Sequence, residues 1–199
     1  MPVFFYISYT ALWLLVLILS VLVLLLYRHF GLATLGTAEG VQRDGLPIGE
    51  KAPPFSGLTV QGELIAWEPS HNHITLLGFI SPDCSPCARI LPYIKQLEKT
   101  KHDIDIVLVT SGPLATITSV VNKFRLPATI LSMADDGSGA ADTYRVRVSP
   151  FAFVIGKDRQ ILGKGLCDRP ERLQTLLEAG GVDAVDFLEV TTNVTPTEV

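Results

Sequence analysis

The N-terminal end of the chain is a long run without any charged side chain. Residues 2–27 contain no Asp, Glu, Lys or Arg, and the 24 residues 3–26 read VFFYISYTALWLLVLILSVLVLLL. A helix of that length rises about 36 Å, which is enough to cross a hydrocarbon core of about 30 Å. Because a backbone in lipid must satisfy its own hydrogen bonds, the run predicts one transmembrane helix within an N-terminal anchor of residues 1–30.

A cleaved signal peptide is the alternative interpretation of this run, with cleavage near Thr37-Ala38. Such peptides begin with basic residues and have an apolar stretch of about 7–15 residues, whereas no Lys or Arg precedes this longer run. We therefore expect the anchor to be retained. Arg28 follows the run, and on this one residue the positive-inside rule favours a cytoplasmic C-terminal side.

Beyond the anchor the composition is that of a soluble domain. Residues 31–48 are rich in Gly, Ala and Thr and predict a linker, residues 49–181 predict a folded domain, and residues 182–199 predict a flexible tail. The formal net charge is −4, from 16 basic and 20 acidic residues, which gives no basic surface for nucleic acid. Nucleic acid is therefore not an expected partner.

Hydrophobic patterning in residues 49–181 predicts an α/β fold. Helices alternate with strands first and an antiparallel pair follows, so we expect a central mixed sheet with helices on both faces and an N-terminal β-hairpin extension. The predicted elements are a hairpin over 56–65, strands over 73–80, 105–109, 128–131, 151–155 and 160–162, helices over 84–101 and 114–124, and a last helix capped by Asp168 and ended by Gly180-Gly181.

Two of the three cysteines, Cys84 and Cys87, form a C-x-x-C at the junction of a predicted strand and a predicted helix. Unpaired N–H groups and the macrodipole at a helix N-terminus stabilise negative charge. We therefore expect the pKa of the Cys84 thiol to lie below the free value of about 8.5, so that Cys84 is the nucleophile. The charge of Asp83 opposes this shift.

Helical spacing puts Cys87 on the apolar face, one turn after Cys84, where we expect it to be buried and to act as the resolving thiol. Cys167 is expected to be a small buried apolar residue. His71 and His73 are expected to be solvated, and a structural zinc site would need four ligands. No metal and no cofactor are therefore predicted.

The chain resembles thioredoxin at this point. Pro92 matches the proline that kinks the helix after the redox pair in that family, and Ser149-Pro150 matches its cis-proline. The resemblance implies a thioredoxin-like fold in which Pro150 is cis. It also implies that the loop of Ser149 and Pro150 lies against Cys84 and binds a protein substrate, together with Ser85 and Pro86 beside the cysteines.

Within this superfamily the chain is similar to TlpA-like redoxins, and most of all to the MauD accessory proteins of methylamine utilisation. The similarity lies in the uncharged N-terminal span, in LPIGEKAP at residues 46–53, in FISPDCSPC at residues 79–87 and in GKGL at residues 163–166. It implies help in maturing methylamine dehydrogenase, whose small subunit carries many disulfides, in the periplasm. A membrane electron donor or acceptor is the second implied partner.

Two departures from the thioredoxin pattern concern the redox site. Asp83 stands where many of these proteins have Trp, and Gly78 stands where thioredoxins have a buried acid six residues ahead of the first cysteine. The group that exchanges a proton with Cys87 is therefore unassigned. A reductase, an isomerase and an oxidase all stay open, because the sequence does not give the reduction potential.

Three functions share this fold. The preferred one is a thiol–disulfide oxidoreductase acting on a protein client. A peroxiredoxin-type peroxidase is the second, but Ile80 and Ser81 stand where that family has its Pro and Thr. A copper-delivery module, with both thiolates and a histidine as ligands, is the third. Since disulfide clients persist outside the reducing cytosol, we expect a single-pass protein of the bacterial inner membrane with its C-terminal domain in the periplasm, against the weak signal of Arg28.

Overall fold

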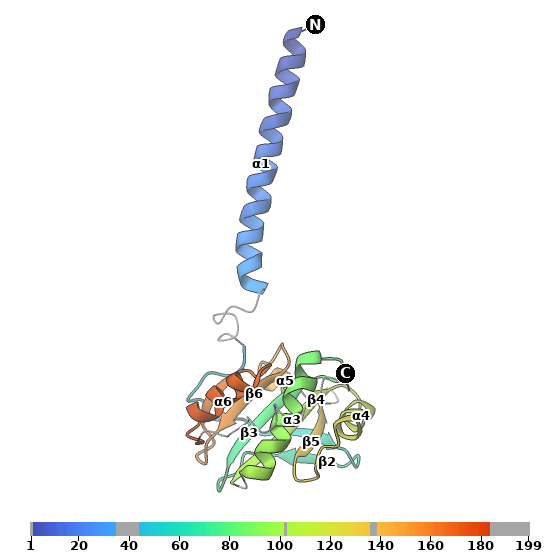
Figure 1. The fold of residues 1–199 in the computed structure, drawn as a ribbon, viewed down its shortest axis with the longest axis vertical. Helices are drawn as coiled ribbons and strands as arrows, with labels where there is room; N and C mark the ends of the chain where they lie inside the picture. The colour runs from blue at the N-terminus through green and yellow to red at the C-terminus, as the bar shows by residue number, and fades with distance from the viewer. Residues whose placement is uncertain (1, 35–43, 102, 136–138, 184–199) are drawn as a thin grey trace. The chain divides into compact units, whose positions relative to one another are not determined.

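The computed structural model describes residues 2–34, 44–101, 103–135 and 139–183 (Figure 1). Contacts divide the chain into two compact units, one ending at Arg43 and the other beginning at Asp44. The predicted tail from 184 onwards and half of the predicted linker, residues 35–43, lie outside the described residues.

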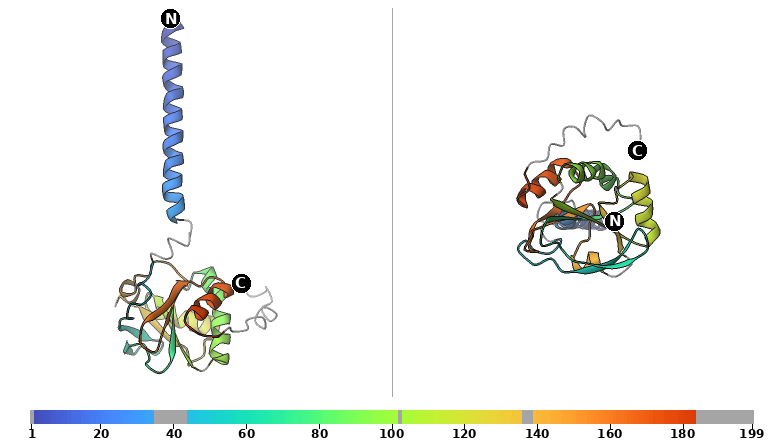
Figure 2. Two further views of the ribbon diagram at one scale, coloured as in Figure 1. Left: turned by 90° about the vertical axis from the view of Figure 1, so that its left-hand side faces the viewer. Right: turned by 90° about the horizontal axis from the view of Figure 1, so that it is seen from below.

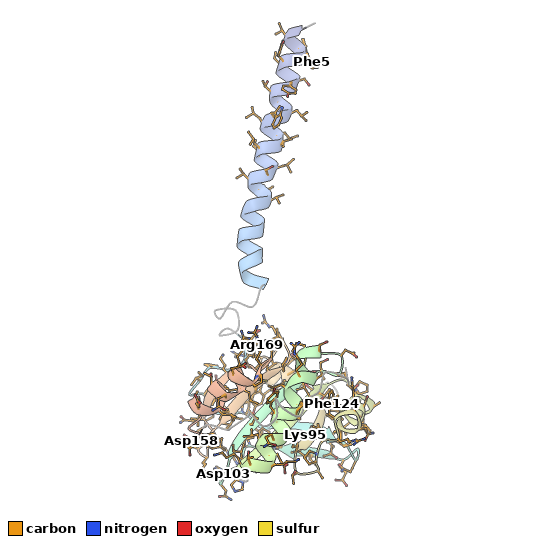
Figure 3. All side chains as sticks on the ribbon, in the orientation of Figure 1. Phe5, Lys95, Asp103, Phe124, Asp158 and Arg169 are labelled. Atoms are coloured by element: carbon orange, nitrogen blue, oxygen red, sulfur yellow. A yellow bond between two sulfur atoms is a disulfide. The ribbon has the colours of Figure 1, made fainter. Side chains whose placement is uncertain are left out.

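The described part of the N-terminal unit is the helix α1 (Pro2–Thr34). Its segment Val3–Val23 is long and apolar enough to cross a membrane, as the uncharged run predicts. The helix continues four residues past the predicted end of the anchor at residue 30, because residues 31–34 hold no proline and only one glycine to stop it. Phe5, labelled in Figure 3, begins an aromatic row along the helix. Its ring centroid lies 6.4 Å from that of Tyr9, which lies 6.3 Å from that of Trp13.

The second unit is built on a seven-stranded mixed sheet in the order β2-β1-β5-β4-β3-β6-β7. Strand β3 is parallel to β4 on one side and antiparallel to β6 on the other, and six of its seven residues are buried. The strands are β1 (Phe55–Thr59), β2 (Leu64–Trp67), β3 (Ile74–Ile80), β4 (Ile104–Ser111), β5 (Leu131–Asp135), β6 (Phe151–Ile155) and β7 (Ile161–Leu166).

Helices lie on both faces of the sheet, as predicted, but unequally (Figure 2). One face carries α3 (Ser85–Thr100), α4 (Leu114–Phe124) and α6 (Pro170–Ala179), whose apolar sides share a core with Leu76, Leu108 and Val154 of the strands. In the part of the chain that the structure describes, the other face carries one helix, the four-residue α5 (Ala140–Thr143). There the buried ring of Tyr144 packs on Phe79 and Phe153.

The compact unit is longer at both ends than residues 49–181. Gly45 and Leu46, predicted as linker, donate backbone hydrogen bonds to the carbonyls of Arg145 and Tyr144. Gly45 takes a positive φ of 75°, and its backbone lies so close to the ring of Phe153 that a Cβ would be 2.8 Å from it. These are tertiary contacts, which composition does not reveal.

At the other end Val182, predicted as the first tail residue, is buried and donates its N–H to Leu177. Two local predictions were also wrong. The strand predicted over 128–131 begins only at Leu131, because Pro127 starts a turn that its carbonyl closes with the N–H of Ile130. Asp168 does not cap α6; its carboxylate instead pairs with Arg172, 2.8 Å away.

Candidate redox site

The candidate site is built where β3 ends and α3 begins. After Ile80 the chain turns, with the N–H of Cys84 donating to the carbonyl of Ser81, and α3 starts at Ser85 with Cys84 as its N-terminal cap. Pro86 lies in the first turn of this helix, where its missing N–H costs no intrahelical hydrogen bond. Cys84 and Cys87 form a disulfide in the structure, with their Cα atoms 5.2 Å apart.

The backbone of α3 is arranged to stabilise charge on Cys84. The N–H of Cys87 donates to the Sγ of Cys84 across 3.1 Å, so the sulfur takes the place of the capping oxygen that usually begins a helix. A hydrogen bond to a charged acceptor contributes about 1.5–3 kcal/mol and the helix dipole about 0.3–1 kcal/mol. Both contributions favour the thiolate over the thiol.

Asp83 opposes this stabilisation, as the sequence indicates, but its side chain is exposed. A charge acting through water contributes only about 1 kcal/mol at 4 Å and is screened further by salt. The hydrogen bond and the dipole together are therefore the larger effect. This arrangement suits Cys84, rather than Cys87, for the role of nucleophile.

The two sulfurs differ in access. Cys84 is half-buried, whereas Cys87 is 1% exposed and packs in the core among Ile90 and Leu91. An incoming disulfide can therefore reach Cys84 but not Cys87. This arrangement suits Cys84 for attack and Cys87 for resolving a mixed disulfide one helical turn away.

The loop before β6 completes the site. The peptide bond between Ser149 and Pro150 is cis, as the resemblance implies. The Sγ of Cys84 lies 3.5 Å from the carbonyl oxygen of Ser149, and the Ser149 side chain is exposed while Pro150 is buried. Strand β6 brings this loop to Cys84 because it pairs with β3 directly, with Phe151 opposite Phe79.

The structure thus brings Cys84 and Cys87 together with Ser149 and Pro150. The other two residues proposed from the sequence, the exposed Ser85 and the half-buried Pro86, lie between the cysteines. Gly78, at the position of the buried acid in thioredoxins, has no room for a side chain. A Cβ added there would lie 2.9 Å from the Cδ2 of Leu108 on β4. Apolar packing therefore occupies the position from which thioredoxins would present a carboxylate to the resolving cysteine.

Cys167 lies beside the cis-proline loop, a position that its sequence separation from Cys84 does not indicate. Its N–H donates to the carbonyl of Pro150, because Leu166 of β7 pairs with Phe151 of β6. The register of that hairpin was the signal that could have placed it. The side chain is buried, as predicted, and burial raises the pKa of the Cys167 thiol to about 12.

The histidines lie away from the cysteines. His71 and His73 precede β3, whereas Cys84 follows its far end, and seven strand residues span about 23 Å. Both side chains are exposed, and Nδ1 of His73 contacts the carboxylate of Asp105 at 3.1 Å. Neither histidine can therefore join the two sulfurs as a third metal ligand in this fold.

A family model described as the AhpC/TSA family matches residues 48–163, more than half of the chain. The chain belongs to the AhpC/TSA family. The match runs from before β1 into the first half of β7 and includes Cys84, Cys87 and Pro150.

Individual relatives include MauD proteins and ResA oxidoreductases. The methylamine utilization protein MauD of Methylobacillus flagellatus is 30% identical over 137 residues, which are 67% of this chain and 64% of that protein. The thiol-disulfide oxidoreductase ResA of Bacillus anthracis is 24% identical over 69% of this chain and 85% of its own length. The chain spans slightly less than two thirds of the first MauD relatives that it matches.

A similar solved structure is the thioredoxin domain of a thiol-disulfide oxidoreductase from Bacteroides vulgatus. It superposes with a TM-score of 0.57, at 19% identity, over 67% of this chain and 96% of that domain. At this identity the likeness establishes the fold, which is thioredoxin-like as predicted.

The unequal access of the cysteines predicts their order of alkylation. When the full chain is reduced in detergent at pH 8 and given limiting iodoacetamide, Cys84 should be modified at least about tenfold faster than Cys87. Cys167 should stay unmodified until denaturant is added, since a thiol with a pKa raised to about 12 is protonated at pH 8 and this one is buried. Peptide mass spectrometry measures all three, and faster labelling of Cys87 than of Cys84 would contradict the assignment.

Proposed function

We propose that the chain is a membrane-anchored thiol–disulfide oxidoreductase that acts on the disulfides of a protein client. The observation that carries this proposal is the hydrogen bond from the N–H of Cys87 to the Sγ of Cys84 at the start of α3. This hydrogen bond favours the thiolate of the accessible Cys84. The buried Cys87 lies close enough to form a disulfide with it. The printed name of the ResA relative, a thiol-disulfide oxidoreductase, supports the same activity.

In the reducing direction the Cys84 thiolate attacks one sulfur of the client disulfide. The client's S–S bond breaks, its other sulfur leaves as a thiolate, and a mixed disulfide joins Cys84 to the client. Cys87 then loses its proton and attacks the Sγ of Cys84, which releases the client as a dithiol and leaves Cys84–Cys87 as the disulfide. Two electrons pass to the client, and the same steps in reverse oxidise it.

The loop of Ser149 and Pro150 is proposed to bind the client, with Ser85 and Pro86 contacting it from the other side. The contact of 3.5 Å between the Cys84 sulfur and the Ser149 carbonyl supports this role. A client strand laid along the exposed Ser149 would present its sulfur to Cys84. In the dithiol state the same carbonyl can accept a hydrogen bond from the Cys84 thiol.

The small subunit of methylamine dehydrogenase is the proposed client, and maturation of that enzyme is the proposed process. The support is the printed name of the MauD relatives, methylamine utilization protein. The proposed second partner is a membrane protein that returns the Cys84–Cys87 pair to its working redox state.

Two other functions fit less well. A peroxidase is favoured only by the family description, while Ile80 and Ser81 occupy the positions where such enzymes carry Pro and Thr. A copper-delivery module lacks a third ligand: among the described residues no group of three or more His, Cys, Asp or Glu is placed to hold a metal.

A redox titration of the full chain in detergent separates the three functions. We expect one two-electron thiol couple, absent in Cys84→Ser and unchanged in Cys167→Ala, because only Cys84 and Cys87 exchange electrons. The reduced protein should retain no copper after gel filtration and should consume peroxide far more slowly than it reduces a disulfide. Peroxide turnover that rivals disulfide exchange would reject the proposal in favour of the peroxidase.

The domain is proposed to lie in the periplasm, anchored by residues 3–26 in the bacterial inner membrane. This follows from the chemistry, since client disulfides persist outside the cytosol, and it opposes the weak signal of Arg28. A reporter that is active only after export, fused after Val199, should therefore be active in a bacterial host. An inactive reporter at this site, together with an active cytoplasmic reporter at the same site, would place the domain in the cytoplasm instead.

A further inference from the structure

The loop that leads to the cis bond presents two arginines. Arg145 and Arg147 are both exposed, and among the described residues neither forms an ion pair. Arg147 lies two residues before Ser149, whose carbonyl oxygen is 3.5 Å from the Cys84 sulfur. Since successive Cα atoms are about 3.8 Å apart, the Cα of Arg147 lies no more than about 8 Å from the Cα of Ser149.

The same loop also exposes an apolar side chain. Val148, between Arg147 and Ser149, is 39% exposed. Within the described part of the second unit, only Ile48 and Leu64 are other large hydrophobic side chains with such exposure. The surface of residues 145–149 therefore combines apolar area with two exposed arginines that form no ion pair among the described residues, and it ends at Ser149, whose carbonyl contacts Cys84.

A second pair of arginines lies at the same end of the domain. The N–H of Cys167 bonds to the carbonyl of Pro150, so the chain that enters α6 starts beside this loop. Arg169, labelled in Figure 3, and Arg172 both contact the carboxylate of Asp168, at 3.7 and 2.8 Å. The exposed Glu171 lies in the same first turn of α6, so this cluster adds no net charge. The positive charge beside the loop therefore comes from Arg145 and Arg147.

The positive charge of this loop contrasts with the formal net charge of the whole chain, which is −4. The exposed acid nearest to Cys84 in sequence is Asp83, on the α3 side of the sulfur. The site therefore has a negative group on the side of α3 and positive groups on the side of the loop. A client segment lying along the loop meets arginines there.

We propose that the loop of residues 145–149 selects clients by charge: it binds an extended polypeptide segment that carries acidic side chains next to the disulfide cysteine. The apolar Val148 takes a neighbouring apolar side chain of the same segment. This inference rests on the proposed oxidoreductase function and names the class of client for it. Electrostatic complementarity of this kind acts mainly on the rate of association and on the choice of partner.

The test uses three synthetic peptides, each closed by one disulfide and flanked by acidic, neutral or basic residues. The reduced full chain in detergent should reduce the acidic peptide roughly 3- to 10-fold faster than the basic one at low salt, as expected for one or two charge pairs in water. At 0.5 M salt the ratio should fall towards one. The ratio is the readout because a change in the reactivity of Cys84 itself affects all three peptides equally.

Arg145→Glu combined with Arg147→Glu should reverse the preference, so that the basic peptide reacts faster. Arg125→Glu is the matched control, because Arg125 is also exposed and also takes a positive φ, of 49° against 56° at Arg145, but caps the far end of α4. It should leave the ratio unchanged. Equal rates for the three peptides, or an unchanged preference in the double variant, would overturn the inference while leaving the oxidoreductase function intact. If no peptide reacts at all, the function and the inference fall together.

Discussion

The hydrogen bond between the N–H of Cys87 and the sulfur of Cys84 is the contact on which the rest of the site depends. It exists because α3 begins at Ser85, so that the N–H of Cys87 belongs to the first turn and has no carbonyl partner inside the helix. A serine or aspartate would meet that need with an oxygen. Here a sulfur does, and the helix start thereby becomes a place where a sulfur anion is stable.

The sheet determines where this helix begins and what faces it. Strand β3 is buried between β4 and β6, so its end is fixed by pairing on both sides. The same pairing with β6 delivers Ser149 and the cis bond to the other side of Cys84. The core under α3, with Cys87 in it, closes the route to the second sulfur. The position of β3 between β4 and β6 thus accounts both for the accessibility of Cys84 and for the burial of Cys87.

The parts of the fold that could be predicted from the sequence are those specified by local pattern. The apolar run of residues 3–26 and the junction of β3 with Cys84 follow from hydrophobicity and helix-start rules, and the structure agrees with both. The position of Pro150 came from resemblance. No local rule specifies that its peptide bond is cis, since either isomer is open to an X–Pro bond.

The parts that could not be predicted depend on contacts distant in sequence. Gly45 joins the domain by donating its N–H to the carbonyl of Arg145, a hundred positions away. The local sequence, rich in Gly and Ala, does not indicate this hydrogen bond. Asp168 resembles a helix cap, but Arg172 one turn later takes its carboxylate. The hydrogen bond from Cys167 to Pro150 follows from the register of β6 and β7. In each case a tertiary partner outweighed a local preference.

The central claim is that Cys84 attacks and Cys87 resolves, and trapping the mixed disulfide tests it most directly. The Cys87→Ser variant, reduced and mixed with a disulfide-bonded model protein, should accumulate a covalent complex joined through Cys84, because the sulfur that would release it is gone. The Cys84→Ser variant under the same conditions should accumulate none. A complex that forms through Cys87 in Cys84→Ser, at a rate equal to that of the first variant, would contradict the account.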